Sequence, residues 1–271
     1  YDIPFEIDRK DEDYPSLEEE AMTAINALSD ATKDSDKGFF LLIEGSRIDH
    51  AGHQNDPSAQ VREVLAFDKA FEAVVNYAKE TDVETILIST SDHETGGLTV
   101  ARQVTTSYPD YVWYPQVLTK ATHSGEFLSK KILRYRSEGH HKEDEFIKKE
   151  LFEEGLGIKD YTDQDVRNVM DATDMGNLNR VLNDMISVRA RIGWTTTGHS
   201  AVDVNIYAYA NKKDTWHNLL ISLQGNNENT DIGAFMERFL EIDLLEVTER
   251  VRGTEHSPKS VEAQSQTASF D

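Results

Sequence analysis

Two short apolar runs separated by a long amphipathic segment constrain the fold of this chain more than any other feature. The runs are residues 39–43 and 85–90, and runs of this kind are typical of strands buried on both faces of a parallel sheet. Between them, Asp56-Pro57 marks a helix start, and apolar residues recur at three- and four-residue spacing as far as Ala78. Strand, helix and strand make a βαβ unit with a right-handed crossover. We therefore predict a three-layer α/β sandwich, with helices on both faces of a mostly parallel central sheet.

The remaining segments are expected to be mostly helical. Ser16 and Glu19 form a capping box that opens an amphipathic helix. Residues 105–135, rich in tyrosine and proline, are predicted to be irregular and to begin an insertion at about 105–192. The other predicted elements are helices at 144–152, 163–172, 178–192 (closed by Gly193) and 230–240, and a half-buried strand at 202–210. Residues 1–252 would then form the folded domain, followed by a disordered tail at 253–271.

Composition narrows the functional classes. The formal net charge of −22 over 271 residues would repel nucleic acids and anionic membranes, so neither is expected as a partner. It would also repel an anionic substrate unless bound cations created a local positive region. The chain has no cysteine, which excludes disulfides and thiol catalysis. No apolar run approaches the length of a membrane span, and the first residues do not resemble a signal peptide.

Carboxylate and histidine side chains gather at the predicted strand ends. The candidates are Glu44, Asp49, His53, Asp92, His93 and His199. Because ligands bind at the carboxyl ends of strands in open α/β sheets, these segments are expected to meet at one edge. Asp49 and His53 are four residues apart, so a helix would turn both to the same side. Carboxylate and imidazole are the usual ligand mixture for Zn²⁺, and a pair of metal ions is the standard arrangement for in-line attack on phosphorus.

Each candidate also has a simpler interpretation. Asp49 and His53 could be two surface residues of a helix, Asp92-His93 a solvated turn, and His199 a structural histidine. The coincidence of three such segments at predicted strand edges favours a metal site over these alternatives. His50 could lie behind the ligands or face solvent. The histidines without such a context, expected on the surface, are His123, His140, His141 and His217.

Three longer segments resemble the alkaline phosphatase family, in particular its fungal vacuolar type. They are residues 37–56 (KGFFLLIEGSRIDHAGHQND), 89–98 (STSDHETGGL) and 194–207 (WTTTGHSAVDVNIY). The resemblance covers most of residues 1–250 and corresponds to only the C-terminal half of the family's chain. It implies an alkaline-phosphatase-like α/β fold and the cofactors of that family, two Zn²⁺ ions and one Mg²⁺ ion.

The resemblance also implies a role for each candidate ligand. The implied ligands are Asp49, His53 and His199 for a first zinc ion, Asp92 and His93 for a second, and Glu44 for the Mg²⁺ ion. In the family, the nucleophilic serine and the arginine that clamps the phosphate lie in the N-terminal half. Near the candidate ligands, the serines do not match the family's nucleophile motif and the arginines do not match its phosphate clamp. These residues are Ser46, Ser91, Arg47 and Arg102. We therefore expect no catalytic nucleophile in this chain, and no activity from the chain alone.

The function that the resemblance implies is metal-dependent hydrolysis of phosphate monoesters through a phosphoserine intermediate. The implied partners are an N-terminal half of the same protein and a second copy in a homodimer, and the implied location is the vacuolar lumen or the cell exterior. Two alternatives stay open. A related phosphodiesterase or phosphomutase shares the ligand pattern but lacks an equivalent of Glu44, and the chain could also be an inactive metal-binding fragment.

Overall fold

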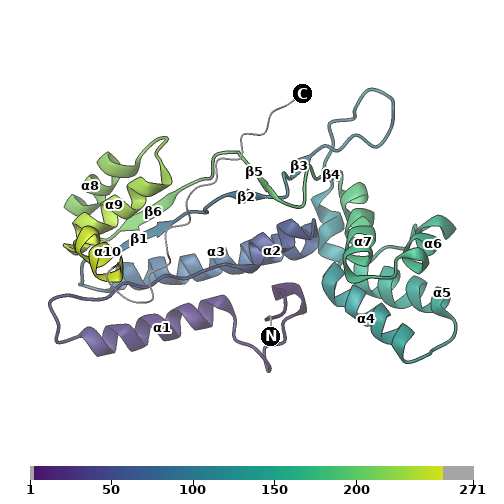
Figure 1. The fold of residues 1–271 in the computed structure, drawn as a ribbon, viewed down its shortest axis with the longest axis horizontal. Helices are drawn as coiled ribbons and strands as arrows, with labels where there is room; N and C mark the ends of the chain where they lie inside the picture. Colours follow the sequence, from purple (N-terminus) through teal and green to yellow (C-terminus); the bar gives the residue numbers. More distant parts are fainter. Residues whose placement is uncertain (1–2, 253–271) are drawn as a thin grey trace. The chain divides into compact units, whose positions relative to one another are not determined.

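The computed structural model describes residues 3–252, which divide into two compact units (Figure 1). The first unit is Tyr1–Tyr209 and the second is Ala210–Asp271. The predicted tail at 253–271 lies outside the described residues. Every candidate metal ligand belongs to the first unit.

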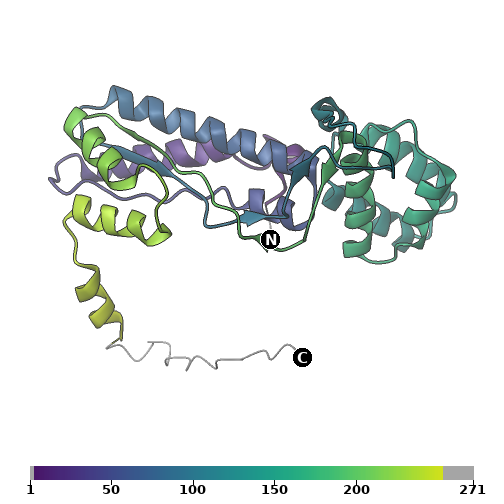
Figure 2. The same cartoon turned by 90° about the horizontal axis from the view of Figure 1, so that it is seen from above.

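The N-terminal part of the first unit is helical, and it includes the two helices predicted to start at Ser16 and at Asp56-Pro57. Its helices are the 3₁₀ turn η1 (Glu6–Asp8), α1 (Leu17–Thr32), α2 (Arg47–His53) and α3 (Pro57–Glu80). The predicted capping box opens α1, because the Ser16 hydroxyl accepts from the Glu19 amide and the Glu19 carboxylate accepts from the Ser16 amide. α3 begins with Pro57 after the cap residue Asp56. It packs along both α1 and α2 (Figures 1 and 2).

The strands form three separate two-stranded ladders rather than one sheet. They are β1 (Ile86–Ser89), β2 (Glu94–Thr95), β3 (Thr99–Val100), β4 (Ile192–Gly193), β5 (His199–Ser200) and β6 (Tyr207–Ala210). β1 pairs with β6, and the ladders β2–β5 and β3–β4 are antiparallel. The strand predicted at 85–90 is confirmed as β1, whereas the strand predicted at 202–210 is formed only in its last four residues. A mostly parallel central sheet is therefore not present in residues 3–252.

The prediction of a strand at residues 39–43 is wrong for the described structure. This segment has no regular structure, and Phe40 and Leu42 are 57% and 79% exposed. A buried strand needs a neighbour on each side to pair its backbone groups, and no described strand pairs with this segment. The βαβ unit expected from the two apolar runs is therefore not formed within residues 3–252.

The largest hydrophobic core lies between residues 118 and 192. The elements of this region are η2 (Pro115–Lys120), α4 (Gly125–Ser137), α5 (Glu143–Phe146), the π-helical η3 (Ile147–Leu156), α6 (Asp163–Asp171) and α7 (Met175–Ala190). Leu128, Leu151 and Leu182 are fully buried at the contacts of this group. These helices gather in one group in Figures 1 and 2.

Two predictions in this region need correction. Residues 105–135 are not irregular throughout, because the Ser124 hydroxyl caps α4 by accepting from the Phe127 amide. The helix predicted to be closed by Gly193 ends earlier. Arg191 follows its last residue, Ala190, and takes the left-handed conformation with φ of 61°. Gly193 instead belongs to β4.

The second unit contains three helices among its described residues. They are α8 (Lys213–Leu223), α9 (Asn229–Leu240) and α10 (Leu244–Arg252). α9 confirms the helix predicted at 230–240, and α10, which follows it, was not predicted. α8 was missed, although Trp216, Leu219 and Leu223 recur along it at helical spacing. Within residues 3–252, no helix combines the length and the apolar character that crossing a bilayer requires.

Candidate metal centre

The short helix α2 carries two of the candidate ligands. Asp49 and His53 are one helical turn apart, and the Asp49 Oδ2 and His53 Nε2 atoms lie 3.3 Å apart. Gly52 lets this helix approach β2, since a Cβ atom there would come within 2.9 Å of the Thr95 carbonyl oxygen. The predicted helical spacing of Asp49 and His53 is therefore realised, directly against the β2–β5 ladder.

The β2–β5 ladder brings the other two segments together. Thr95 pairs with His199, and Glu94 with Ser200. The Glu94 carboxylate accepts from the Ser200 hydroxyl, and also from the Gly97 amide at 3.0 Å. Burial alone would raise the pKa of Glu94, but these hydrogen bonds and the charge of His199 lower it below its ordinary value. Segments more than 100 residues apart in sequence are thus fixed beside each other.

Three candidate ligands from three segments form one cluster. Asp49, His93 and His199 each offer a ligand atom, and these atoms lie within 4.8 Å of one another. His53 joins them, because its Nε2 atom is 3.3 Å from His199 Nε2. The rings of His93 and His199 stack with their centroids 3.4 Å apart. The cluster includes residues of both implied zinc sets, so the two sets are adjacent in space.

The donor atoms of this cluster fit zinc. His53 Nδ1 lies 2.6 Å from the Thr197 carbonyl oxygen. An amide oxygen can only accept, so Nδ1 carries the ring hydrogen and the Nε2 lone pair is free to bind a metal ion. Two ligands of a tetrahedral zinc ion, each about 2.0–2.1 Å from it, lie about 3.3 Å apart. The His53–Asp49 and His53–His199 separations of 3.3 Å both have this value.

Asp92 and Glu44 occupy more open positions. Asp92 Oδ2 lies 3.3 Å from His93 Nε2, the spacing of two ligands on one ion, although the Asp92 side chain is 77% exposed. Glu44 is exposed as well. In the part of the chain that the structure describes, it belongs to no group of three or more metal-ligand side chains. The assignment of Glu44 to Mg²⁺ therefore stays a prediction.

The other histidines divide into two classes. His50 is exposed, with its Nδ1 atom 3.4 Å from an Arg47 nitrogen, which supports the solvent-facing alternative. His123 was expected on the surface but is half-buried, because it stacks on Phe127 and bonds Asp8 at 2.9 Å. Among residues 3–252, the other three histidines are exposed as expected, and they are His140, His141 and His217.

Two residues that sequence reasoning missed hold the ligand segments together. Asn55 takes a φ of 50°, and its amide nitrogen donates to the Gly52 and Thr196 carbonyl oxygens, both at 2.9 Å. It thereby ties the end of α2 to the loop before His199. Thr95 contacts both Asp49 and His93 through its hydroxyl. The only sequence signal for either was its position beside a ligand, since the contacts that tie them to another segment, Asn55 to Thr196 and Thr95 to Asp49, span 141 and 46 residues.

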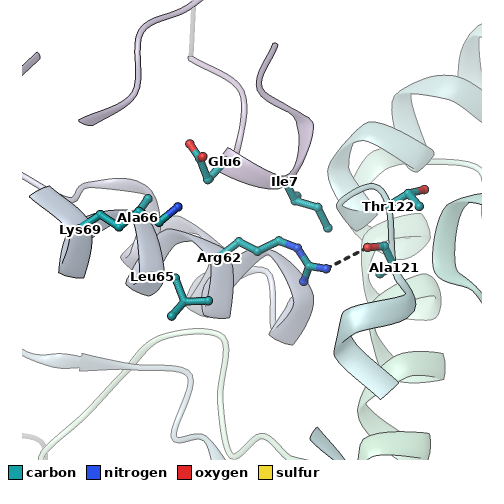
Figure 3. A pocket seen from close by; sticks show the side chains of 8 residues that line it. All are labelled: Glu6, Ile7, Arg62, Leu65, Ala66, Lys69, Ala121 and Thr122. Carbon is teal, nitrogen blue, oxygen red and sulfur yellow. Dashed lines mark hydrogen bonds between the residues drawn. The ribbon is translucent and has the colours of Figure 1, made fainter. Parts of the chain in front are cut away.

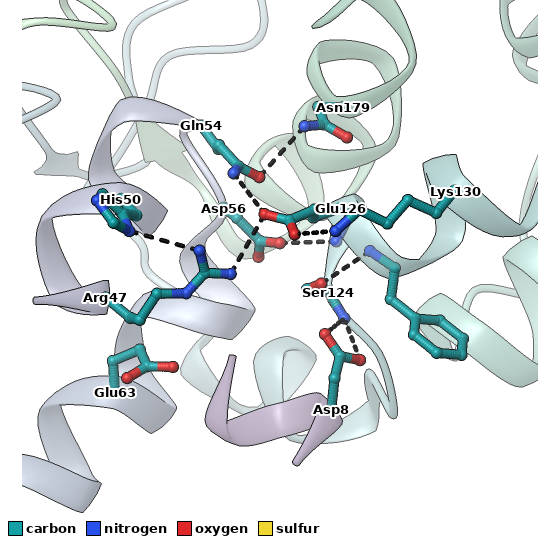
Figure 4. Close-up of polar contacts among 12 residues, drawn as sticks. Asp8, Arg47, His50, Gln54, Asp56, Glu63, Ser124, Glu126, Lys130 and Asn179 are labelled. Carbon is teal, nitrogen blue, oxygen red and sulfur yellow. Dashed lines mark hydrogen bonds and ion pairs between the residues drawn. The ribbon is translucent and has the colours of Figure 1, made fainter. Parts of the chain in front are cut away.

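A polar network behind α2 anchors this helix to the helical core (Figure 4). The Glu126 carboxylate of α4 accepts from Gln54 at 2.8 Å and lies 3.3 Å from the Arg47 guanidinium. Burial raises the pKa of Glu126, but the hydrogen bonds from Lys130 and Gln54 and the charge of Arg47 lower it overall. The Arg47 guanidinium also lies over the Phe5 ring at 3.6 Å. The helix that carries Asp49 and His53 is therefore held on its far side by charged contacts.

A cavity of about 410 Å³ lies elsewhere in the first unit and contains none of the candidate ligands (Figure 3). Its lining includes Glu6, Arg62 and Lys69. The Arg62 guanidinium is already bound to the carbonyl oxygens of Leu118 and Ala121, at 3.1 and 3.0 Å. Together with a third hydrogen bond to the Ser58 carbonyl oxygen, these contacts use three of the five guanidinium donors and fasten η2 to α3.

Solved structures with a similar fold define the class of this chain as α/β. The structure of a cold-active alkaline phosphatase from Shewanella sp. matches with a TM-score of 0.69 at 27% identity, over 88% of this chain and 52% of that one. The structure of Thermus thermophilus alkaline phosphatase matches with a TM-score of 0.57 at 28% identity, over 76% of this chain and 45% of that one.

The sequence comparisons agree with the fold. The family model for alkaline phosphatase matches residues 1–242, and the chain belongs to the alkaline phosphatase family. It is 60% identical to the repressible alkaline phosphatase of Saccharomyces cerevisiae, over 94% of this chain and 46% of that protein. It is 44% identical to an alkaline phosphatase of Schizosaccharomyces pombe, over 93% of this chain and 45% of that protein. The resemblance to the family and its fungal members is thus confirmed, and the chain spans about half the length of these curated relatives.

Proposed function

We propose that this chain provides the zinc-binding part of a metal-dependent phosphomonoesterase. The observation that carries the proposal is the convergence of Asp49, His53 and His199, from α2 and β5. His53 Nε2 lies 3.3 Å from both Asp49 Oδ2 and His199 Nε2, the spacing expected for ligands of one zinc ion, and His199 Nε2 lies 3.9 Å from Asp49 Oδ1. His93 stacks beside them and faces Asp92, which supports a second zinc set next to the first. Family membership supports the reaction class, hydrolysis of phosphate monoesters through a phosphoserine intermediate.

The residues of this chain would position the cofactors rather than attack the substrate. Bound zinc ions supply Lewis-acid stabilisation of the negative charge that develops on phosphate oxygens. The Thr197 carbonyl orients the His53 ring, and Asn55 holds the His199 loop against α2. The bound cations would also create a local positive centre that attracts the substrate. Without it, a formal charge of −22 would repel a phosphate dianion.

We further propose that residues 1–252 form the C-terminal half of the alkaline phosphatase domain, with the region at about 105–192 as an insertion. The partner would be an N-terminal half of the same protein, carrying the nucleophilic serine and the phosphate-clamping arginine. The exposed apolar residues Phe40 and Leu42 support this, because a segment with that sequence is expected to be covered by neighbouring strands. A homodimer, a Mg²⁺ ion held in part by Glu44, and a vacuolar or extracellular location belong to the same proposal.

The test compares metal content and hydrolysis in the full-length protein. Wild-type protein is expected to bind zinc and to hydrolyse p-nitrophenyl phosphate, to lose hydrolysis on chelation, and to regain it when zinc returns. His199→Ala should lower the zinc content and reduce turnover strongly, since it removes one ligand of the first set. His217→Ala is the matched control, because His217 is exposed on α8 and should leave both measurements unchanged.

The same assays separate the alternatives. Preferential hydrolysis of bis-p-nitrophenyl phosphate would favour a phosphodiesterase. Bound zinc without hydrolysis of either compound would favour an inactive metal-binding protein. Unchanged zinc content in His199→Ala would show that His199 is not a zinc ligand.

A further inference from the structure

The Thr95 hydroxyl touches candidate ligands of both proposed zinc sets. Thr95 Oγ1 donates to Asp49 Oδ1 at 2.5 Å and lies 3.2 Å from His93 Nδ1. The residue is 6% exposed, so water does not compete freely for these contacts. One buried oxygen atom therefore connects the carboxylate of the first set with the imidazole of the second.

The hydrogen atoms in these contacts can be assigned by counting donors. An ionised carboxylate can only accept, so the single hydroxyl hydrogen of Thr95 is committed to Asp49. The lone pairs that remain on Oγ1 can then accept the hydrogen of His93 Nδ1. This arrangement selects the His93 tautomer that is protonated on Nδ1 and leaves its Nε2 lone pair facing Asp92 Oδ2, 3.3 Å away.

The backbone of Thr95 is fixed as firmly as its hydroxyl. Thr95 is the ladder partner of His199 in β5, and α2 packs on it through Gly52, which has no room for a Cβ atom. Thr95 is thus held between the elements that supply Asp49, His53 and His199. It can transmit a displacement of one zinc set to the other.

We propose that Thr95 is a positioning residue that couples the two zinc sites, by orienting Asp49 and by fixing the His93 tautomer through one hydroxyl group. The inference rests on the proposed function, because it requires that both sets bind zinc. It predicts that losing the hydroxyl weakens zinc at both sites, although Thr95 is a ligand at neither.

The test measures zinc affinity by chelator competition in the full-length protein, independently of turnover. Thr95→Val keeps the shape of the side chain and removes the hydroxyl, whereas Thr95→Ser keeps the hydroxyl and removes the methyl group. We expect zinc to bind roughly 10–100-fold more weakly at both sites in Thr95→Val, as for other residues that orient metal ligands, and Thr95→Ser to restore near wild-type affinity. Thr99→Val is the matched control, because the Thr99 hydroxyl contacts only the Gly193 carbonyl, at 3.4 Å.

The outcomes separate a hydroxyl role from a packing role. Wild-type affinity in Thr95→Val with weakened binding in Thr95→Ser would overturn the inference, and so would weakening at only one site. Thr95→Ala, which also lacks the hydroxyl, takes the place of Thr95→Val if melting of the metal-free protein shows that the valine variant does not fold. A wild-type protein that binds no zinc would overturn the proposed function together with this inference, whereas failure of the variants alone leaves the proposed function standing.

Discussion

Asp56 connects two helices from a position that is only 1% exposed. Its Oδ1 atom caps α3 by accepting from the Ser58 and Ala59 amides, at 3.0 and 2.9 Å, and its Oδ2 atom accepts from the Gly125 amide at 2.7 Å. Burial raises the pKa of Asp56 above its ordinary value, aided by the charge of Asp8, although the three amide hydrogen bonds act in the opposite direction. The ionised form of this carboxyl group is therefore less favourable in the folded protein than in the unfolded chain.

This elevated pKa predicts a specific pH dependence of stability. Between the unfolded pKa of about 3.9 and the higher folded pKa, the folded protein binds more protons than the unfolded chain. The contribution of Asp56 to the free energy of unfolding is therefore greatest below the unfolded pKa and falls as pH rises through this window, by about 1.4 kcal/mol for each pKa unit of elevation.

Chemical denaturation of wild type and Asp56→Asn at a series of pH values checks this prediction, because asparagine cannot ionise. The difference in the free energy of unfolding, wild type minus variant, should decrease as pH rises above 4 and then level off. A difference that increases with pH would show that the folded protein favours the ionised carboxylate instead.

The elements of this chain divide into those that local sequence could predict and those that it could not. α1 and α3 follow from caps and helical periodicity within a few residues of each other, and both predictions are confirmed. The β2–β5 ladder pairs segments over 100 residues apart, and nothing in either dipeptide specifies its partner. The candidate ligands could be selected from sequence because each lies in a short local motif. The role of Thr95 could not be predicted, because it depends on a contact with Asp49, 46 residues away.

Two glycines at helix starts provide a matched test of packing between elements. A Cβ atom on Gly125 in α4 would lie 2.0 Å from Asn183 Oδ1, and Asn183 cannot move freely because it is buried and donates to the Gln54 carbonyl. Gly125→Ala should therefore lower the free energy of unfolding by about 1–3 kcal/mol through overpacking. Gly176→Ala in α7 would meet only Asp174 Oδ1 at 3.5 Å and should stabilise the protein by up to about 1 kcal/mol. Equal effects in thermal or urea unfolding would contradict the close contact of α4 and α7 at Asn183.

At the scale of the whole molecule, the candidate ligands lie in one unit, although the chain spans about half the length of its relatives. The cluster of Asp49, His53, His93 and His199 draws all its members from residues 49–199. The segment at 39–43 instead keeps an apolar sequence without a covering strand. The candidate ligands thus come together within residues 3–252, whereas the segment at 39–43 has no strand partner among those residues.

Anomalous diffraction at the zinc edge, from crystals of the full-length protein grown with zinc, tests the central claim most directly. We expect one peak about 2.0–2.2 Å from the Asp49 carboxylate, His53 Nε2 and His199 Nε2, and a second peak beside Asp92 and His93. Absence of a peak at these positions, in a preparation that hydrolyses p-nitrophenyl phosphate, would contradict the assignment of this cluster as the metal centre.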